Sequence, residues 1–436
     1  MTVRTRRILF YALFFLFFVF GGALTAYSLG IKLDFKTLSL SGTGGIYLKS
    51  EPPDVNIFLN GKPVENKTGF FQSGTLIDKL AKDFYHVTLT RSGYFGWEKE
   101  VEVETSLVEV FDAIVLVPKS EPEWLADPAD SFHVSGSNLI LVRDGKVVAG
   151  NDKVIGSKIE DFVEEGFLIT YDEKTKVYYL SDLFEPGSAL NVNALFNNLK
   201  ESRLNLAGAV PVIKVAFHPF NRKKLIIQSR GALYNLDTSR LTIEQISGAI
   251  KDFRVKGEEV VFYDSKVVYR YNLIFRTKTT ITELNGTDAA IKNLEIDAGN
   301  RVIVLFSDGK LLFTENGGKT KNIADKVKIV VPSGNSRFTA FADYDGPIYV
   351  YRADKETYLK LETGIEEEII DIVWYKDDKH LFVKAGNKLY FTEVDDNLPL
   401  NTIRLATDVS GFYYQSGTDY LYFNLPGGVY RYKMEI

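Results

Sequence analysis

The chain has 436 residues, 45% of them hydrophobic, so it is long enough to bury two or three domain cores. It contains no cysteine, which excludes a disulfide framework, a cysteine nucleophile and thiolate metal sites. The net charge is −5 without a basic cluster in the main part of the chain, so we expect no nucleic-acid partner. The aromatic share of 13% favours strands over helices.

The N-terminal segment from Ile8 to Leu29 contains no charged residue. As a helix it would be roughly 33 Å long at about 1.5 Å per residue, enough to cross a hydrocarbon core of about 30 Å. Arg4, Arg6 and Arg7 precede it, so the positive-inside rule predicts that residues 1–7 are cytoplasmic. The sequence therefore predicts a single-pass cell-membrane protein that contacts the lipid bilayer through residues 8–29, with its C-terminal domains extracytoplasmic.

Two other interpretations of this segment stay open. A buried core helix would normally keep a polar stripe, which this segment lacks. A cleaved signal peptide would use small residues such as Ala26 and Ser28 for cleavage, but the apolar run exceeds the roughly 7–15 residues of a usual signal core. An uncleaved anchor is the favoured interpretation, and a signal peptide would export the rest of the chain equally.

Residues 30–43 are rich in small polar side chains and are predicted to be a spacer. A small β unit is predicted over residues 44–118, with a tight turn at Asn60 and Gly61 and an end at Pro118. Its expected strands alternate apolar and polar residues or are mainly apolar: Gly45–Lys49, Val55–Leu59, His86–Thr90, Glu98–Val103 and Val108–Val117.

This unit resembles the PEGA family of small β-sandwich domains. The features that carry the resemblance follow one another in order: Ser50, Pro52 and Pro53, then Asn60 and Gly61, Thr68, Leu80, the strand Tyr85–Thr90, Gly93 and Tyr94, and Leu116. The four-letter motif of the family is replaced by Pro52, Pro53, Asp54 and Val55, and Gly69 stands where proline is usual. The resemblance implies an extracytoplasmic β-sandwich at a cell surface and brings no catalytic residue.

From residue 119 to 436 the sequence repeats a block of two apolar strands around a tight polar turn. The blocks are Leu139–Val148, Phe167–Leu180, Leu225–Leu236, Val260–Tyr271, Val302–Phe313, Phe338–Tyr351, Leu381–Phe391 and Leu421–Tyr432. The last six start at residues 225, 260, 302, 338, 381 and 421, so the starts lie 35, 42, 36, 43 and 40 residues apart. A four-stranded propeller blade takes about 40–50 residues, so the repeat predicts a seven- or eight-bladed β-propeller.

Another short strand precedes several blocks and is predicted to be the innermost strand of a blade: Ile213–Phe217, Ile250–Val255, Ile291–Ile296, Val327–Val331 and Ile369–Trp374. Ile243–Ile246 is predicted to be an outer strand. The period resembles that of WD-repeat and related propellers, but the Trp-Asp signature is absent, so no subfamily's function is implied. An array of β-sandwiches with accidental spacing is the alternative. The expected fold is all-β with one transmembrane helix.

The segment Asn191–Leu204 interrupts the repeat with apolar residues at helical spacing, including Leu195, Phe196 and Leu199. It predicts a short amphipathic helix. Such a helix would pack its apolar face on a blade edge, or it would dock a partner.

The sequence shows no assembled reaction site. Its four histidines, His86, His133, His218 and His380, lack metal-ligand spacing, and His218 is the one expected near a channel mouth. Ser135 and Ser137 have the composition of an ordinary polar turn, and no Gly-x-Ser-x-Gly elbow occurs. We therefore expect no catalytic, cofactor-binding or metal-ligating residue.

Two further motifs are structural in the favoured interpretation. Thr314–Thr320 resembles the Asp-box turn of sialidase-like propellers, which implies a stabilised hairpin between outer strands. The carboxylates Asp377 with Asp378, Asp395 with Asp396, and Glu366–Glu368 are expected in solvated turns because they lack calcium-loop spacing.

Two functions compete on this basis. The first is a membrane-anchored extracytoplasmic binding or scaffold protein of the cell envelope, whose propeller binds an envelope protein or a glycan. The second is a membrane-tethered hydrolase or lyase that acts on glycans or peptides at the propeller channel. Fold class alone does not decide between them.

Overall fold

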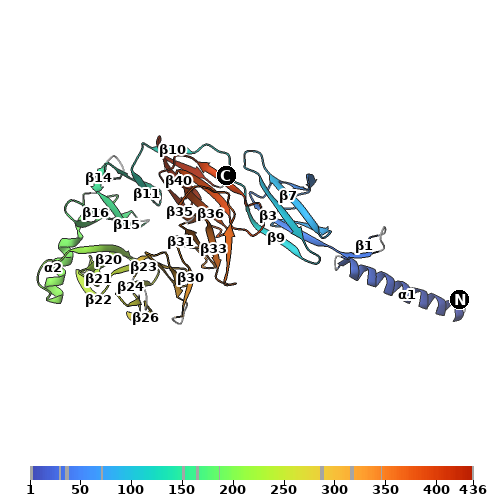
Figure 1. Cartoon of the computed structure of the whole chain (residues 1–436), viewed down its shortest axis with the longest axis horizontal. Helices are drawn as coiled ribbons and strands as arrows, with labels where there is room; N and C mark the ends of the chain where they lie inside the picture. Colours follow the sequence, from blue (N-terminus) through green and yellow to red (C-terminus); the bar gives the residue numbers. More distant parts are fainter. Residues whose placement is uncertain are drawn as a thin grey trace. The chain divides into compact units, whose positions relative to one another are not determined.

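The structure is a computed structural model that describes residues 3–28, 31–34, 39–69, 72–149, 153–163, 166–185, 187–284, 289–314, 319–344 and 346–434. The chain is nearly all β (Figure 1). It divides into two compact units. Unit 1 contains Met1–Glu121, Thr392–Ile403 and Met434–Ile436, and unit 2 contains Pro122–Phe391 and Arg404–Lys433.

Helix α1 runs from Val3 to Ser28 and lacks acidic residues in its first turn. Its apolar side chains are exposed over most of its length, so it is not a core helix of unit 1. Strand β1 (Ile31–Asp34) then pairs antiparallel with β2 (Ser39–Gly42). A short ladder thus lies in the segment that the sequence predicts to be a spacer.

The rest of unit 1 contains two sheets. One is three-stranded, in the order β6 (Thr75–Leu80), β3 (Gly44–Glu51) and β9 (Val108–Val115), with β3 and β9 parallel. The other is four-stranded, in the order β5 (Lys62–Val64), β4 (Asn56–Leu59), β7 (Asp83–Thr90) and β8 (Trp97–Val103). The five predicted strands are present, whereas β5 and β6 were not predicted.

Both sheets contribute side chains to a single core. Ile46 and Leu48 come from β3, Val87 and Leu89 from β7, and Val101 from β8, and all are fully or almost fully buried. In β8 buried and exposed residues alternate along the strand, as expected for a sheet with one covered face.

Unit 1 also includes a segment from much later in the chain, residues 392–403. It binds β8 through Lys99, whose side chain is fully buried. Lys99 Nζ lies 2.6 Å from Glu393 Oε1 and donates to the Asn397 carbonyl at 2.6 Å. The other carboxylate oxygen of Glu393 accepts from Trp97 Nε1 at 2.9 Å. Lys99 and Glu393 therefore form a buried charge pair in which each side chain makes a further hydrogen bond.

Backbone contacts fix the same segment on β8. The amide of Glu98 donates to Asn401 Oδ1 at 3.0 Å, and Asn401 Nδ2 donates to the Glu98 carbonyl at 3.0 Å. The amide of Glu100 donates to the Leu398 carbonyl at 3.1 Å. The 392–403 segment thus binds the backbone of an otherwise exposed strand edge.

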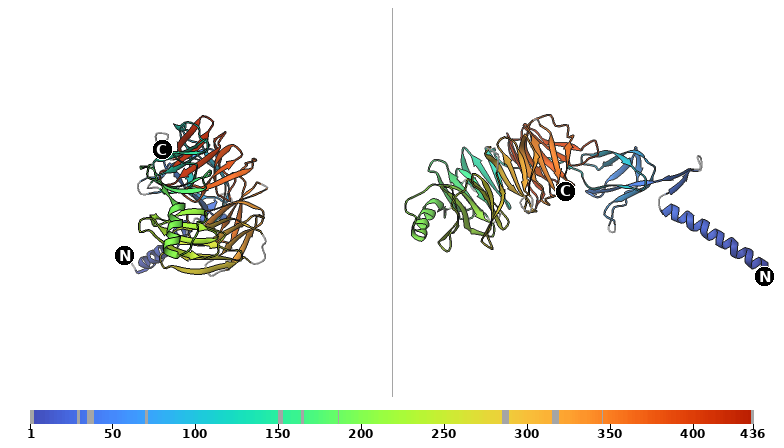
Figure 2. Two further views of the ribbon diagram at one scale, coloured as in Figure 1. Left: turned by 90° about the vertical axis from the view of Figure 1, so that its left-hand side faces the viewer. Right: turned by 60° about the horizontal axis from the view of Figure 1, so that its bottom comes forward.

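Unit 2 consists of eight four-stranded sheets among the described residues (Figures 1 and 2). The first four are β11 (Ser131–Ser135), β12 (Asn138–Arg143), β13 (Lys146–Ala149) and β14 (Lys153–Gly156); β15 (Lys158–Phe162), β16 (Phe167–Asp172), β17 (Val177–Asp182) and β18 (Leu190–Asn191); β19 (Val212–His218), β20 (Asn221–Ser229), β21 (Ala232–Asp237) and β22 (Thr242–Ser247); β23 (Asp252–Lys256), β24 (Glu259–Tyr263), β25 (Val267–Asn272) and β26 (Thr277–Glu283).

The other four sheets are β27 (Ile291–Ile296), β28 (Val302–Phe306), β29 (Leu311–Thr314) and β30 (Thr320–Ala324); β31 (Val327–Pro332), β32 (Phe338–Asp343), β33 (Ile348–Arg352) and β34 (Thr357–Leu361); β35 (Ile369–Trp374), β36 (His380–Ala385), β37 (Lys388–Glu393) and β38 (Thr402–Ala406); β39 (Gly411–Gln415), β40 (Tyr420–Leu425) and β41 (Gly428–Lys433), with β10 (Glu123–Ala126) as fourth strand. The eight repeated blocks of the sequence are the second and third strands of these sheets.

Successive sheets pack face to face. Val261 and Val268 of one sheet share a core with Leu294 and Val304 of the next. The last sheet packs on the first in the same way, through Tyr422 and Phe132. Since the early strand β10 also pairs with β41, the sheets close into a ring. Unit 2 is therefore β-propeller-like.

The second strands explain why the repeat was visible in the sequence. In β28 and β36 every residue is buried. A strand covered on both faces is mainly apolar, as in all of β28 and in residues 381–383 of β36, and such a run stands out against the polar turns. The first strands carry more polar residues and contact one another from sheet to sheet, for example β15 with β19 and β19 with β23.

Helix α2 (Val192–Leu204) follows β18 and packs on β17 and β22 (Figure 1). Val192, Phe196 and Leu199 are buried in the core that the two neighbouring sheets share. The structure thus confirms the predicted helix. Its apolar face is occupied by unit 2, which agrees with packing on the blades rather than with partner docking.

The N-cap of α2 provides a first test of this packing. Asn191 Oδ1 accepts from the amide of Ala194 at 2.9 Å. Because this satisfies an otherwise unpaired N–H, Asn191→Ala is expected to cost the helix about 1 kcal/mol. Hydrogen exchange of the α2 amides measures this loss. Glu201→Ala, at an exposed position of the helix, serves as the control and is expected to change exchange little.

Candidate functional site

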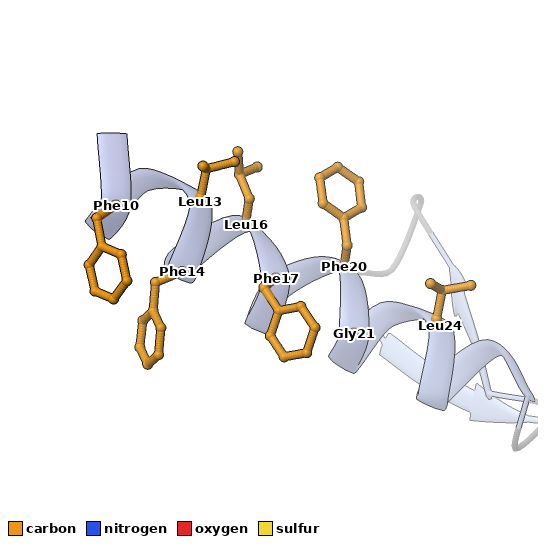
Figure 3. A pocket seen from close by; sticks show the side chains of 8 residues that line it. All are labelled: Phe10, Leu13, Phe14, Leu16, Phe17, Phe20, Gly21 and Leu24. Atoms are coloured by element: carbon orange, nitrogen blue, oxygen red, sulfur yellow. The ribbon is translucent and has the colours of Figure 1, made fainter. Parts of the chain in front are cut away.

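The surface of α1 is the first candidate site. A shallow pocket lies on this helix and is lined by its residues alone (Figure 3): Phe10, Leu13, Phe14, Leu16, Phe17, Phe20, Gly21 and Leu24. Phe17 is 72% exposed and Phe20 is 61% exposed. Arg4–Gly22 is long and apolar enough to cross a membrane, and no residue of this window is buried. An exposed apolar surface on this scale requires an apolar environment.

The first strands of unit 2 carry the second candidate site, a charged cluster of Glu160, Lys214, Asp252 and Arg254. Lys214 Nζ of β19 lies 2.5 Å from Asp252 Oδ1 of β23 and donates to the Phe253 carbonyl at 2.7 Å. Arg254 Nη1 lies 3.2 Å from Asp252 Oδ2. The amino group of Lys214 thus joins the first strands of two neighbouring sheets.

The same kind of contact recurs along the ring. Lys256 Nζ donates to the Ile296 carbonyl at 2.6 Å, and Lys292 Nζ donates to the Lys328 carbonyl at 2.9 Å. Lys328 in turn pairs with Glu368 and donates to the Ile369 carbonyl at 3.1 Å. These lysines therefore connect consecutive first strands from β19 to β35, and each donates a hydrogen bond within the fold.

Burial shifts the pKa of several of these groups. It lowers the pKa of Lys214, although the hydrogen bond to Asp252 acts in the opposite direction. It raises the pKa of the Asp371 carboxyl on β35. Burial also raises the pKa of the Tyr178 hydroxyl, which donates to the Ile213 carbonyl at 2.5 Å. Perturbed groups are often functional, but here each has a structural partner.

Asp161 on β15 is the clearest case of a buried carboxyl in this ring. Its Oδ1 accepts from the Phe162 amide at 2.9 Å and its Oδ2 from the Phe217 amide of β19 at 2.8 Å. Burial raises its pKa above the ordinary 3.8 despite these bonds.

This shift predicts a pH dependence. Because the folded pKa is raised, the unfolded chain loses this proton first as pH rises, and folding becomes less favourable just above pH 3.8. The stability advantage of the native chain over Asp161→Asn should therefore shrink as pH rises through that window. Urea unfolding at a series of pH values measures it. An advantage that grows with pH would contradict the raised pKa.

The four histidines have different surroundings. His86 is partly exposed near Glu98 and Glu100, at 3.8 and 3.7 Å. The rings of His133 and Phe162 are 5.7 Å apart, and burial lowers the pKa of His133.

The other two are buried. His218, predicted near a channel mouth, is only 8% exposed, and its Nδ1 accepts from the Phe220 amide at 3.3 Å. Burial lowers its pKa. His380 Nδ1 lies 2.7 Å from Asp377 Oδ2, and its ring stacks on Phe391 with centroids 5.0 Å apart. Both are held inside the fold.

The carboxylates expected in solvated turns are largely engaged. Asp377 pairs with His380, and both oxygens of Asp378 accept backbone amides, from Gly334 and Asn335. Asp395 lies 3.6 Å from Lys99, and Glu367 pairs with Lys388. These four residues are therefore not simply solvated. The partners of Asp378, Asp395 and Glu367 lie far away in the sequence and leave no local pattern, whereas His380 lies three positions after Asp377.

The Asp-box-like segment lies mostly outside the described residues, which omit 315–318. Thr314 of β29 and Thr320 of β30 are paired opposite each other, so a hairpin between outer strands is present at this place. Within the described ranges no group of three or more His, Asp or Glu side chains could hold a metal ion.

No protein-family model and no curated protein matches the chain. Among solved structures it is similar to the computationally designed Ika8 protein, with a TM-score of 0.47, 12% identity, and coverage of 71% of this chain and 98% of that one. It is also similar to Kluyveromyces lactis Hsv2, with a TM-score of 0.40, 17% identity, and coverage of 62% and 90%. It is similar as well to a chain of the mitotic checkpoint complex, with a TM-score of 0.44, 13% identity, and coverage of 73% of this chain and 98% of that one.

The strand order and sheet packing define the class of the protein. It is an all-β chain with a small two-sheet unit, a β-propeller-like unit, and an N-terminal helix long and apolar enough to span a membrane.

Proposed function

We propose that the chain is a membrane-anchored extracytoplasmic binding protein of the cell envelope in which unit 2 is the interaction platform. Helix α1 serves as an uncleaved anchor, and Arg4, Arg6 and Arg7 keep the N-terminus cytoplasmic. Residues 44–118 serve as a PEGA-like sandwich, residues 119–436 as the propeller, and a protein or glycan of the envelope is the partner.

The observation that carries the proposal is the exposed apolar surface of α1. Its side chains make no core with the rest of unit 1, and the window Arg4–Gly22 has a mean hydropathy of 1.5. In water this surface would be costly, whereas in a bilayer it faces hydrocarbon. A signal peptide has the same surface, so cleavage is the property that separates the two.

A binding role for unit 2 is supported by the hydrogen bonds that its charged groups make within the fold. In the cluster around Lys214 the cation, the carboxylate of Asp252 and the hydroxyl of Tyr178 are all engaged by the fold. A general base or nucleophile must instead reach a substrate. The cluster brings charged side chains together, and the charge of its member Glu160 acts on the Tyr178 hydroxyl, raising its pKa; this is the one observation that favours the hydrolase or lyase alternative.

Two measurements test the proposal on the full chain. Alkaline carbonate extraction of membranes, followed by mass determination, should leave an intact chain that retains residues 1–28 in the pellet. External protease should remove the part of the chain that follows α1 from intact cells stripped of their outer layers. A mature chain that starts after Ser28 overturns the anchor. Release of processed glycan or peptide fragments by the purified chain would sink the binding role in favour of the enzyme.

A further inference from the structure

Five exposed apolar side chains lie on one edge of three consecutive sheets of unit 2. In each sheet the turn between the first and second strands and the turn between the third and fourth lie on the same edge, because adjacent strands are antiparallel. The five, here called the turn-tip patch, are Phe184, Phe220, Leu241, Ile274 and Phe275, with exposed fractions of 68, 55, 47, 52 and 74%.

Defined turns hold these side chains outward. Asn272 Oδ1 accepts from the amides of Ile274 and Phe275 at 2.9 and 2.8 Å. In the turn before Leu241, Asp237 Oδ1 accepts two amides in the same manner, at 3.0 and 2.9 Å. Such side-chain bonds fix the turn conformation. The apolar tips are thus built features of the edge.

Local contacts connect the three sheets at this edge. Within the β15–β18 sheet, Phe184 lies against Gly166, where an added Cβ would meet its ring at 2.6 Å. The Arg222 guanidinium lies 4.7 Å from the centroid of Phe167. Arg276 Nη1 lies 3.6 Å from Glu244 Oε2 of the neighbouring sheet. The sheets that carry the patch are therefore joined to their neighbours at this edge.

The middle sheet of the patch, β19–β22, carries basic side chains at this edge, whereas the chain as a whole is acidic. Arg222, Lys223 and Arg240 are exposed on the same turns, and none of them forms an ion pair with a described carboxylate. The net charge of the chain is −5. Glu185 and Glu258 lie at the two ends of the patch, so the positive charge is concentrated on the middle sheet.

We propose that the turn-tip patch binds the surface of an anionic lipid bilayer. The inference rests on the proposed function, since the anchor brings unit 2 to a membrane. Projecting apolar tips can enter the boundary between head groups and acyl chains, while flanking arginine and lysine meet lipid phosphates. An acidic protein partner would share the charge complementarity, but the proposed anchor holds the chain at a membrane, which favours the lipid surface.

The absence of cysteine in the sequence permits a direct test. Phe275→Cys, labelled with an environment-sensitive fluorophore, is placed in the full chain, and α1 is inserted into neutral phosphatidylcholine nanodiscs. Phosphatidylglycerol vesicles are then added. The label should shift to shorter wavelength and be quenched by spin-labelled lipid. Lys223→Gln should weaken vesicle binding about fivefold, the expected effect of removing one basic side chain near an anionic surface.

Tyr344→Cys is the matched control. Tyr344 is an exposed aromatic side chain, 50% exposed, at a turn between second and third strands, and its label should not respond. Equal responses to neutral and anionic vesicles, or no response, overturn the inference. A response to polyglutamate but not to vesicles overturns it in favour of an acidic protein. Failure of α1 to enter nanodiscs is seen before vesicles are added, so it tests the proposed function separately.

Discussion

Lys99→Ala is expected to lower the free energy of unfolding of unit 1 by about 3–5 kcal/mol, because it leaves a buried carboxylate without its cation. Lys99 is fully buried and Glu393 is 8% exposed, so water cannot replace the lost ammonium group. The variant also removes the donor to the Asn397 carbonyl. The 392–403 segment should therefore detach from β8 before the rest of the unit unfolds.

Hydrogen exchange of the β8 amides measures this effect locally, which avoids assigning one unfolding transition to a chain of two units. The Glu98 and Glu100 amides, which donate to Asn401 and Leu398, should lose protection first. Lys82→Ala is the matched control. Lys82 pairs with Glu104 at 3.5 Å with both side chains more than half exposed, so its loss should cost less than about 1 kcal/mol. Equal effects of the two variants would contradict the role of burial.

The double variant Phe17→Arg and Phe18→Arg is expected to abolish membrane retention. Each arginine at the centre of a spanning helix costs about 2.5–3.5 kcal/mol, so the pair costs about 5–7 kcal/mol. Both positions lie in the middle of α1 and are exposed. Carbonate extraction should move the chain from the membrane pellet to the soluble or aggregated fraction.

The control for this variant keeps the helix apolar. Phe17→Leu with Phe18→Leu should stay in the pellet, since leucine is favourable in hydrocarbon and in a helix. Retention of the arginine variant would show that another surface holds the chain on the membrane. The turn-tip patch is the candidate surface, and raised salt would release it but not α1.

The repeat in the sequence was sufficient to predict the propeller-like unit, because the second strand of each sheet is buried on both faces. The repeat was not sufficient to predict the number of sheets. The strand β10 has only four residues, half of them exposed, and it pairs with β41 from the other end of unit 2. In unit 1, β5 escaped prediction because Pro63 lies within a three-residue edge strand.

The candidate sites were predicted less well than the fold. The exposed helix α1 follows from a single run of apolar residues, so the sequence was informative. Lys99 stands between Glu98 and Glu100, which gives the pattern of an exposed strand face, and its partner Glu393 lies 294 positions later. The charged cluster and the turn-tip patch likewise join residues from different sheets. Contacts of this kind leave no local pattern.

The position of the 392–403 segment in the sequence sets an order of folding during synthesis. The bond between Trp97 and Glu393 spans 296 positions. At about 5–20 residues per second, roughly 15–60 s of synthesis separate the two residues. During this interval β8 has an open edge and Lys99 has no counter-charge. A chain stalled in the propeller-like unit would thus keep an unpaired strand edge exposed, which is a site for pairing with other chains.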